Sequence, residues 1–130
     1  MWNSFLIWVV AVGIFLVLDA IWLGVISKRM YREKLGHLMS DKPNLLVAVL
    51  FYLFFIFGLV FFVIKPSIDA ANITYAILAG LLFGAVTYGT YDLTNLATMK
   101  RWPVVVTIVD ILWGSVLCGV VSLLTYLIFV

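Results

Sequence analysis

Four long apolar segments constrain this chain more than any other feature. They lie at about residues 3–27, 45–64, 73–98 and 104–129, and each is close to or above the ~20 residues that a helix needs to cross ~30 Å of hydrocarbon. Hydrophobic residues make up 66% of the 130 positions and charged residues 11%. A water-soluble domain of this size could not bury so much apolar surface. We therefore predict an all-α integral membrane protein, a single domain folded as a four-helix bundle.

The basic residues predict how the chain is oriented in the membrane. Seven of the eight Lys and Arg residues fall in the connections after the first and third segments, and the eighth is Lys65. Both connections lie on one side of a four-span protein, and the positive-inside rule assigns that side to the cytoplasm. We expect a multi-pass protein of the cell inner membrane with both termini on the non-cytoplasmic side. Its loops should be short, apart from a longer basic cytoplasmic loop after the first helix.

Several single residues agree with these boundaries. Pro43 and Pro103 stand near the starts of the second and fourth segments, where the missing amide hydrogen of proline costs nothing. Pro66 follows the expected end of the second segment, and Asn72 is a good N-cap for the third. Tryptophans near the ends of spans suit the two membrane interfaces, as expected here for Trp2 and Trp102.

The first connection allows two interpretations. Tyr31, Leu35, Leu38 and Met39 recur at helical spacing with basic residues between them, which is typical of a short helix lying on the anionic inner leaflet. The same residues also fit a solvated basic turn that only fixes the topology. The sequence leaves both open.

Three aspartates lie inside the apolar segments at one expected depth. Asp19 is nine positions before Lys28, Asp92 is eight before Lys100, and Asp110 is nine after Arg101. At 1.5 Å per residue, each is about 12 to 14 Å inside the cytoplasmic end of its helix. We therefore expect three carboxyl groups at one level in the inner half of the membrane.

Such residues are costly in a bilayer. A charged side chain near the centre of a span costs roughly 2.5 to 3.5 kcal/mol on translocon scales, so all three aspartates should face the bundle interior. The segments contain no Lys or Arg to pair with them. Protons, tyrosine and tryptophan donors, water or a bound cation must then neutralise or solvate the acids. Ionisable residues inside a membrane are functional candidates for this reason.

Polar and aromatic residues share helix faces with these acids. At ~100° per residue, Tyr88 and Asn95 fall on the stripe of Asp92, Tyr91 flanks it, and Trp22 and Trp113 follow Asp19 and Asp110 by three positions. The GLLFG pattern at 80–84 predicts a close approach of another helix. The predicted ligand, proton or cation site comprises Asp19, Trp22, Tyr88, Tyr91, Asp92, Asn95, Asp110 and Trp113.

Other function classes lack support in the sequence. HExxH, GxSxG, Walker and CxxC motifs are all absent, and Cys118 is the single cysteine. A net charge of +2 does not indicate a nucleic-acid partner. We expect no organic cofactor, while the sequence leaves open whether the acids hold a metal ion.

Four stretches carry a resemblance to a known family. They read LDAIWLG, FYLFFIFGLVFFV, YGTYDLTNLATMKRWP and VDILWG. With them the chain resembles a bacterial family of small predicted inner-membrane proteins classed as a domain of unknown function. The resemblance implies a four-helix membrane protein and supplies no activity. It differs from the small multidrug transporters, which carry a glutamate in the first helix where this chain has Asp19.

Three function hypotheses remain. The leading one is a small transporter or permeation protein, assembling as a homo-oligomer, whose acids bind protons or a cation and whose aromatic residues favour a cationic or amphipathic ligand. The second is a membrane-embedded enzyme or accessory subunit that acts on lipids. The third is a purely structural membrane protein. The lipid bilayer is the expected partner in all three.

Overall fold

The structure is a computed structural model that describes residues 3–38 and 44–130. Within these residues it contains helices and no strand, which confirms the predicted all-α membrane fold. The expectations for Trp2, Met39 and Pro43 concern residues outside the described ranges. Four helical stretches are long and apolar enough to cross a membrane: Ser4–Ile26, Leu45–Asp69, Ile73–Thr98 and Val104–Phe129.

The first span changes its helical form near the end. Helix α1 (Ser4–Ile21) begins at Asn3, whose side chain accepts the N–H of Phe5 at 2.7 Å. It passes into a π-helical turn, η1 (Trp22–Ile26), and the backbone N–H of Ser27 then bonds to the carbonyl of Trp22 at 2.8 Å. Helix α2 (Lys28–Leu35) and a 3₁₀ turn, η2 (Gly36–Leu38), follow. Because a π turn has more residues than an α turn, it rotates α2 relative to α1.

The second span runs further than the sequence suggested. It consists of α3 (Leu45–Leu59), a π turn η3 (Val60–Ile64) and α4 (Lys65–Asp69), so Pro66 lies within the helical stretch and does not mark its end. Pro66 has no N–H to give to the carbonyl of Phe62, four residues earlier. The hydroxyl of Tyr75 donates to that carbonyl at 2.8 Å instead. The backbone group freed by Pro66 therefore still has a partner.

Helices α5 (Ile73–Thr98) and α6 (Val104–Phe129) form a tightly packed antiparallel pair. The side chain of Asn72 caps α5, as predicted, by accepting the N–H of Tyr75 at 3.0 Å. The GLLFG pattern does bring a second helix close, because a Cβ atom at Gly84 would overlap the carbonyl of Gly114. This close approach fixes how the polar faces of α5 and α6 meet.

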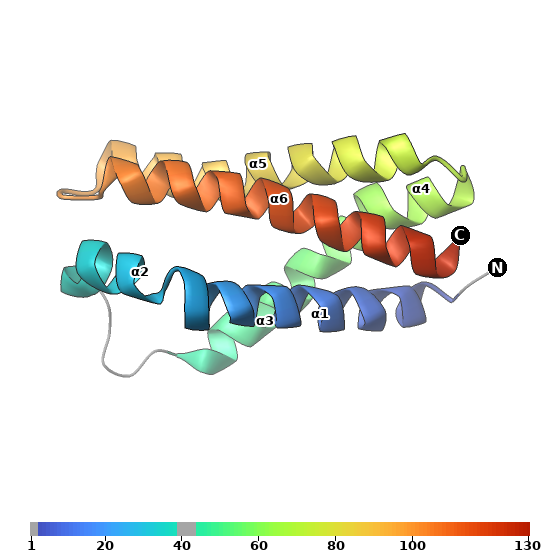
Figure 1. Ribbon diagram of the computed structural model, residues 1–130, viewed down its shortest axis with the longest axis horizontal. Coiled ribbons are helices and arrows are strands. Elements are labelled where there is room, and N and C mark those ends of the chain that lie inside the picture. The colour runs from blue at the N-terminus through green and yellow to red at the C-terminus, as the bar shows by residue number, and fades with distance from the viewer. Residues whose placement is uncertain (1–2, 39–43) are drawn as a thin grey trace.

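The four spans lie side by side as a bundle (Figure 1). The start of α1 and the end of α6 lie at one end of the bundle, and α2 and the α5–α6 turn lie at the other. We call this second end, which carries Lys28, Arg29, Lys100 and Arg101, the basic end. Helix α3 crosses the bundle obliquely and meets α5 and α6 mainly through η3. The packed core lies away from the basic end and includes Ile7, Ala11, Phe15, Ile56, Leu59, Val63, Leu117, Cys118 and Val121.

Candidate functional site

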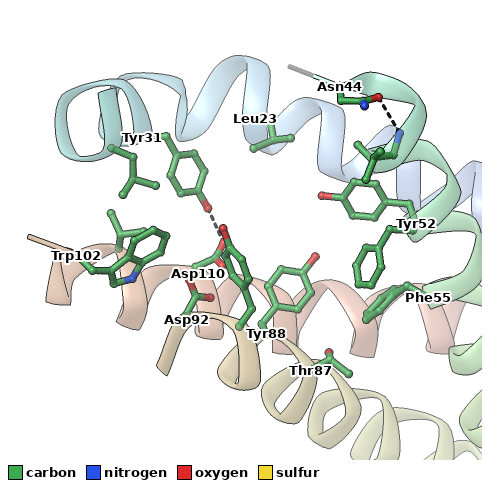
Figure 2. A pocket seen from close by; sticks show the side chains of 16 residues that line it. Leu23, Tyr31, Asn44, Tyr52, Phe55, Thr87, Tyr88, Asp92, Trp102 and Asp110 are labelled. Carbon is green, nitrogen blue, oxygen red and sulfur yellow. Dashed lines mark hydrogen bonds between the residues drawn. The ribbon is translucent and has the colours of Figure 1, made fainter. Parts of the chain in front are cut away.

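A cavity of about 680 Å³ occupies the half of the bundle nearer the basic end (Figure 2). It exists because the first turns of α3 stand apart from α5 and α6, while α2 closes over the side opposite the aspartates. Its walls are mainly aromatic and aliphatic, with a few polar groups. The lining residues are Leu23, Tyr31, Leu35, Asn44, Val47, Ala48, Phe51, Tyr52, Phe55, Thr87, Tyr88, Tyr91, Asp92, Trp102, Val106 and Asp110.

Asp92 is the least satisfied polar group in the cavity wall. Its side chain is fully buried, at 0% exposure. Neither carboxylate oxygen accepts a hydrogen bond from any residue in the described ranges. A buried carboxylate without a partner is strongly disfavoured in its charged form. Asp92 therefore requires a proton, which it can share with Asp110, or water or a bound donor from outside the protein.

Asp110 receives a hydrogen bond from a residue beyond the first span. The hydroxyl of Tyr31 donates to Oδ1 of Asp110 at 2.7 Å, and the indole N–H of Trp22 donates to the same hydroxyl at 3.2 Å. Burial, followed by this bond to Asp110, raises the pKa of the Tyr31 phenol above its ordinary value. Tyr31 therefore remains a hydrogen-bond donor at physiological pH. Asp110 also interacts electrostatically with Asp92, so these two carboxyl groups form one polar site.

Asp19 is joined to the cavity through aromatic side chains. It is 7% exposed and accepts a hydrogen bond of 3.2 Å from the indole N–H of Trp113. The ring of Trp113 stacks on that of Trp22, with centroids 4.5 Å apart and an angle of 7° between the planes. Asp19 also interacts with Asp110. The three acids are thus connected in the order Asp19, Asp110, Asp92.

In the described part of the chain, no basic side chain forms an ion pair with these acids. Among the residues at 3–38 and 44–130, the ion pairs join Arg29 to Glu33 at 2.8 Å and Lys65 to Asp69 at 2.6 Å. The three intramembrane aspartates take part in neither. With only neutral donors on Asp19 and Asp110, full ionisation would place three negative charges in a region of low dielectric constant, where their repulsion is large.

The cavity walls offer aromatic faces close to these acids. Phe55 and Tyr88 meet edge to face with centroids 6.2 Å apart, and Tyr91 and Trp102 do so at 5.9 Å. The indole of Trp102 is held by a hydrogen bond of 3.1 Å to the hydroxyl of Thr107. Aromatic faces attract cations, and Trp and Tyr do so more strongly than Phe. Carboxyl groups and aromatic rings together suit a bound organic cation.

The predicted site residues divide into three groups. Tyr88, Tyr91, Asp92 and Asp110 line the cavity. Asp19, Trp22 and Trp113 do not line it and are connected to it through Tyr31 and Asp110 by the contacts described above. Asn95 is outside the lining, and its backbone carbonyl accepts the N–H of Met99 at 2.8 Å where α5 ends.

Twelve of the sixteen lining residues were not among those predicted, and three of these twelve carry an aromatic ring with a polar group. Trp102, expected at the membrane interface, is buried in the cavity wall. Tyr52 lies in a run of aromatic and aliphatic residues, where no charged residue indicates a site. Tyr31 was expected on the leaflet surface or in a solvated turn, whereas it points into the bundle. Nine residues at 100° each would place it opposite Trp22 on a regular helix, and the π turn η1 brings the two together.

The acids do not form a cluster with many ligands. Among the described residues, no group of three or more His, Cys, Asp or Glu side chains is placed to hold a metal ion. Asp92 and Asp110 together offer carboxylate oxygens to a single positive group, such as an ammonium or a proton.

Comparison with known families identifies the chain by sequence. Residues 4–127 match the family described as predicted membrane protein, DUF2177. The chain belongs to this family. Neither the comparison with curated proteins nor that with solved structures finds a match. Membership in DUF2177 agrees with the resemblance seen in the sequence and with the four candidate spans, and it assigns no activity.

Proposed function

We propose that this DUF2177 protein is a small transporter or permeation protein of the bacterial inner membrane that binds a monovalent organic cation, or protons, at Asp92 and Asp110. In this proposal the basic end faces the cytoplasm and the cavity receives its ligand in the inner half of the membrane. The single observation that carries the proposal is the fully buried carboxyl group of Asp92, which lines a cavity and accepts no hydrogen bond from the described residues.

The chemistry of the site supports exchange between a protonated state and a cation-bound state. Two interacting carboxyl groups in a low dielectric share protons as one unit. A proton satisfies the site, and so does a cation that sits between the carboxylates and the aromatic faces. When both carboxyl groups are protonated the pair is neutral, so a monovalent cation binds there only as one proton leaves, because its charge would otherwise have no counter-ion. Alternate occupancy of this kind couples cation movement to proton movement.

Flux measurements in proteoliposomes test the proposal. The purified protein is reconstituted, a pH gradient is imposed, and uptake of radiolabelled tetramethylammonium is followed. Asp92→Asn should abolish gradient-driven uptake, because the amide cannot exchange a proton for a cation. Asp69→Asn is the matched control, since Asp69 is an exposed aspartate paired with Lys65 on α4, outside the cavity. Uptake at the intact rate in the Asp92 variant would refute the proposal, as would the absence of flux through the intact protein.

A further inference from the structure

A second depression, on the surface between α3 with η3 and α5, adjoins the acidic cavity. Its volume is about 550 Å³, and seven of its eleven lining residues are phenylalanines. Phe51, Phe55 and Thr87 line both this groove and the cavity. The two spaces therefore meet at a common wall, which joins an acidic interior to an apolar outer surface.

The groove offers no free polar group from its two threonines. The hydroxyl of Thr87 donates to the carbonyl of Phe83 at 2.7 Å, and that of Thr90 donates to the carbonyl of Val86 at the same distance. Both hydroxyl hydrogens are therefore already engaged by backbone carbonyls of α5. A hydrocarbon chain would meet a largely apolar surface.

The polarity of the two spaces matches that of a lipid in one leaflet. Along the second span the groove extends from Phe51 to Phe62, about 16 Å at 1.5 Å per residue, and it leads away from the basic end. The cavity, with Asp92 and Asp110, lies nearer the basic end. An amphiphile that enters from the leaflet at the basic end, with its head drawn inward from the interface to Asp92 and Asp110, would have its tail along the groove.

We propose that the site takes an amphiphile with a cationic head, which enters sideways from the membrane with its head at Asp92 and Asp110 and its alkyl tail in the phenylalanine groove. This inference rests on the proposed function and adds the ligand class and the route of entry. Two observations support it independently: the unpartnered buried carboxyl group of Asp92, and the groove that shares walls with its cavity. An anionic head is disfavoured, because no basic residue lines the cavity in the described ranges.

The alkyl tail should contribute contacts and positioning more than hydrophobic free energy. Lipid chains solvate an alkyl tail about as well as a protein groove does, so burial in the groove adds little hydrophobic free energy. The groove instead provides van der Waals contact and holds the head at the carboxyl groups. Dissociation constants must therefore be expressed as mole fractions of amphiphile within the bilayer. On that scale the free energy of transferring the amphiphile from water to lipid is the same for every variant and cancels.

The test uses one head with and without a tail. Binding of radiolabelled tetramethylammonium and dodecyltrimethylammonium is measured on the protein in nanodiscs, relative to empty nanodiscs. Gly58→Leu fills the groove, where a Cβ atom would lie 3.6 Å from the ring of Phe83. Gly13→Leu is the matched control, because Gly13 is exposed on α1 and a Cβ there meets nothing within 4 Å. Val86→Phe narrows the groove from the α5 side and serves if Gly58→Leu does not fold.

The expected results separate the two proposals. Asp92→Asn should weaken both probes by about tenfold or more, since it removes the counter-charge. Gly58→Leu or Val86→Phe should weaken only dodecyltrimethylammonium, by about fivefold or more through lost contacts, and Gly13→Leu should change neither. If the groove variants leave both affinities unchanged while Asp92→Asn weakens them, the amphiphile proposal is wrong and the cation site stands. If the intact protein binds neither probe, both proposals fail.

Discussion

The hydroxyl of Tyr31 lies 2.7 Å from Oδ1 of Asp110, although 79 positions separate them in the sequence. The bond fastens α2, which follows the first span, to the polar face of α6. It also closes one side of the cavity, since both residues line it. The first connection is therefore part of the candidate site.

Removal of the Tyr31 hydroxyl should destabilise the protein. Tyr31→Phe keeps the ring and deletes the hydroxyl, so the half-buried carboxyl group of Asp110 loses this hydrogen-bond donor. The loss should lower the free energy of unfolding by about 1 to 3 kcal/mol. The measurement is thermal unfolding in a mild detergent. Tyr75→Phe is the control, because Tyr75 also donates a hydrogen bond but is 41% exposed. Equal destabilisation by the two variants would argue against a special role for the Tyr31 bond.

Tyr31 should resist ionisation at alkaline pH. Burial and the bond to Asp110 raise the pKa of its phenol above the ordinary value of about 10. Its contribution to stability is full below about pH 10 and is lost as the pH rises above that value towards the higher pKa of the folded state. Phenolate absorbance of the intact protein, compared with Tyr31→Phe, should show no Tyr31 signal near pH 10 to 11. A signal with an ordinary midpoint would contradict the buried position of this phenol.

The sequence predicted the spans well because each depends on local composition. A run of about 20 apolar residues needs no tertiary information to be recognised, and a cap such as Asn72 acts within its own first turn. Helix counting also predicts one depth for Asp19, Asp92 and Asp110, since the α-helical rise is constant over most of each span. These features follow from rules that act along a single helix.

The rest of the site depends on departures from regular helix and on the angle of α3. The π turn η1 rotates α2, so no count at 100° per residue could bring Tyr31 to Trp22. Tyr52 and Phe55 line the cavity only because α3 crosses obliquely and leaves space at the basic end. The sequence of α3 is apolar on all sides and contains no signal for that crossing.

The stacked pair Trp22 and Trp113 should give a distinct optical signal. Parallel indoles 4.5 Å apart couple their transitions, which produces an exciton pattern in ultraviolet circular dichroism. Trp113→Phe should abolish that pattern and cost about 0.5 to 1.5 kcal/mol of stacking free energy, in addition to the lost bond to Asp19. Trp8→Phe is the control, because Trp8 also donates a hydrogen bond, to the carbonyl of Leu53 at 3.0 Å. An exciton pattern that persists in Trp113→Phe would contradict the stacking.

Alanine at the contact between α5 and α6 should disturb the acid pair. In Gly84→Ala and Gly114→Ala the new methyl group would overlap the backbone of α6 or the ring of Tyr88, respectively. Overpacking of this kind typically costs 1 to 3 kcal/mol, and separation of the helices would also move Asp92 away from Asp110. Thermal unfolding and tetramethylammonium binding should both weaken.

The control for this contact is a glycine with space around it. Gly13→Ala adds a methyl group where nothing lies within 4 Å, and it should be neutral or should stabilise α1 by up to about 1 kcal/mol. If all three alanine variants had the same stability, close packing of α5 against α6 would not be the reason that positions 84 and 114 require glycine.

Asp92 should link cation binding to folding. A ligand that binds only the folded protein stabilises it by about 2.7 kcal/mol at one hundred times its dissociation constant, so tetramethylammonium should raise the Tm of the intact protein in a concentration-dependent way. In Asp92→Asn that increase should disappear, because the amide offers no counter-charge to the cation. Asp69→Asn should keep the increase and lose at most about 1 kcal/mol, since its salt bridge with Lys65 is exposed. A cation-dependent rise in Tm that survives in Asp92→Asn would place the binding site elsewhere in the protein.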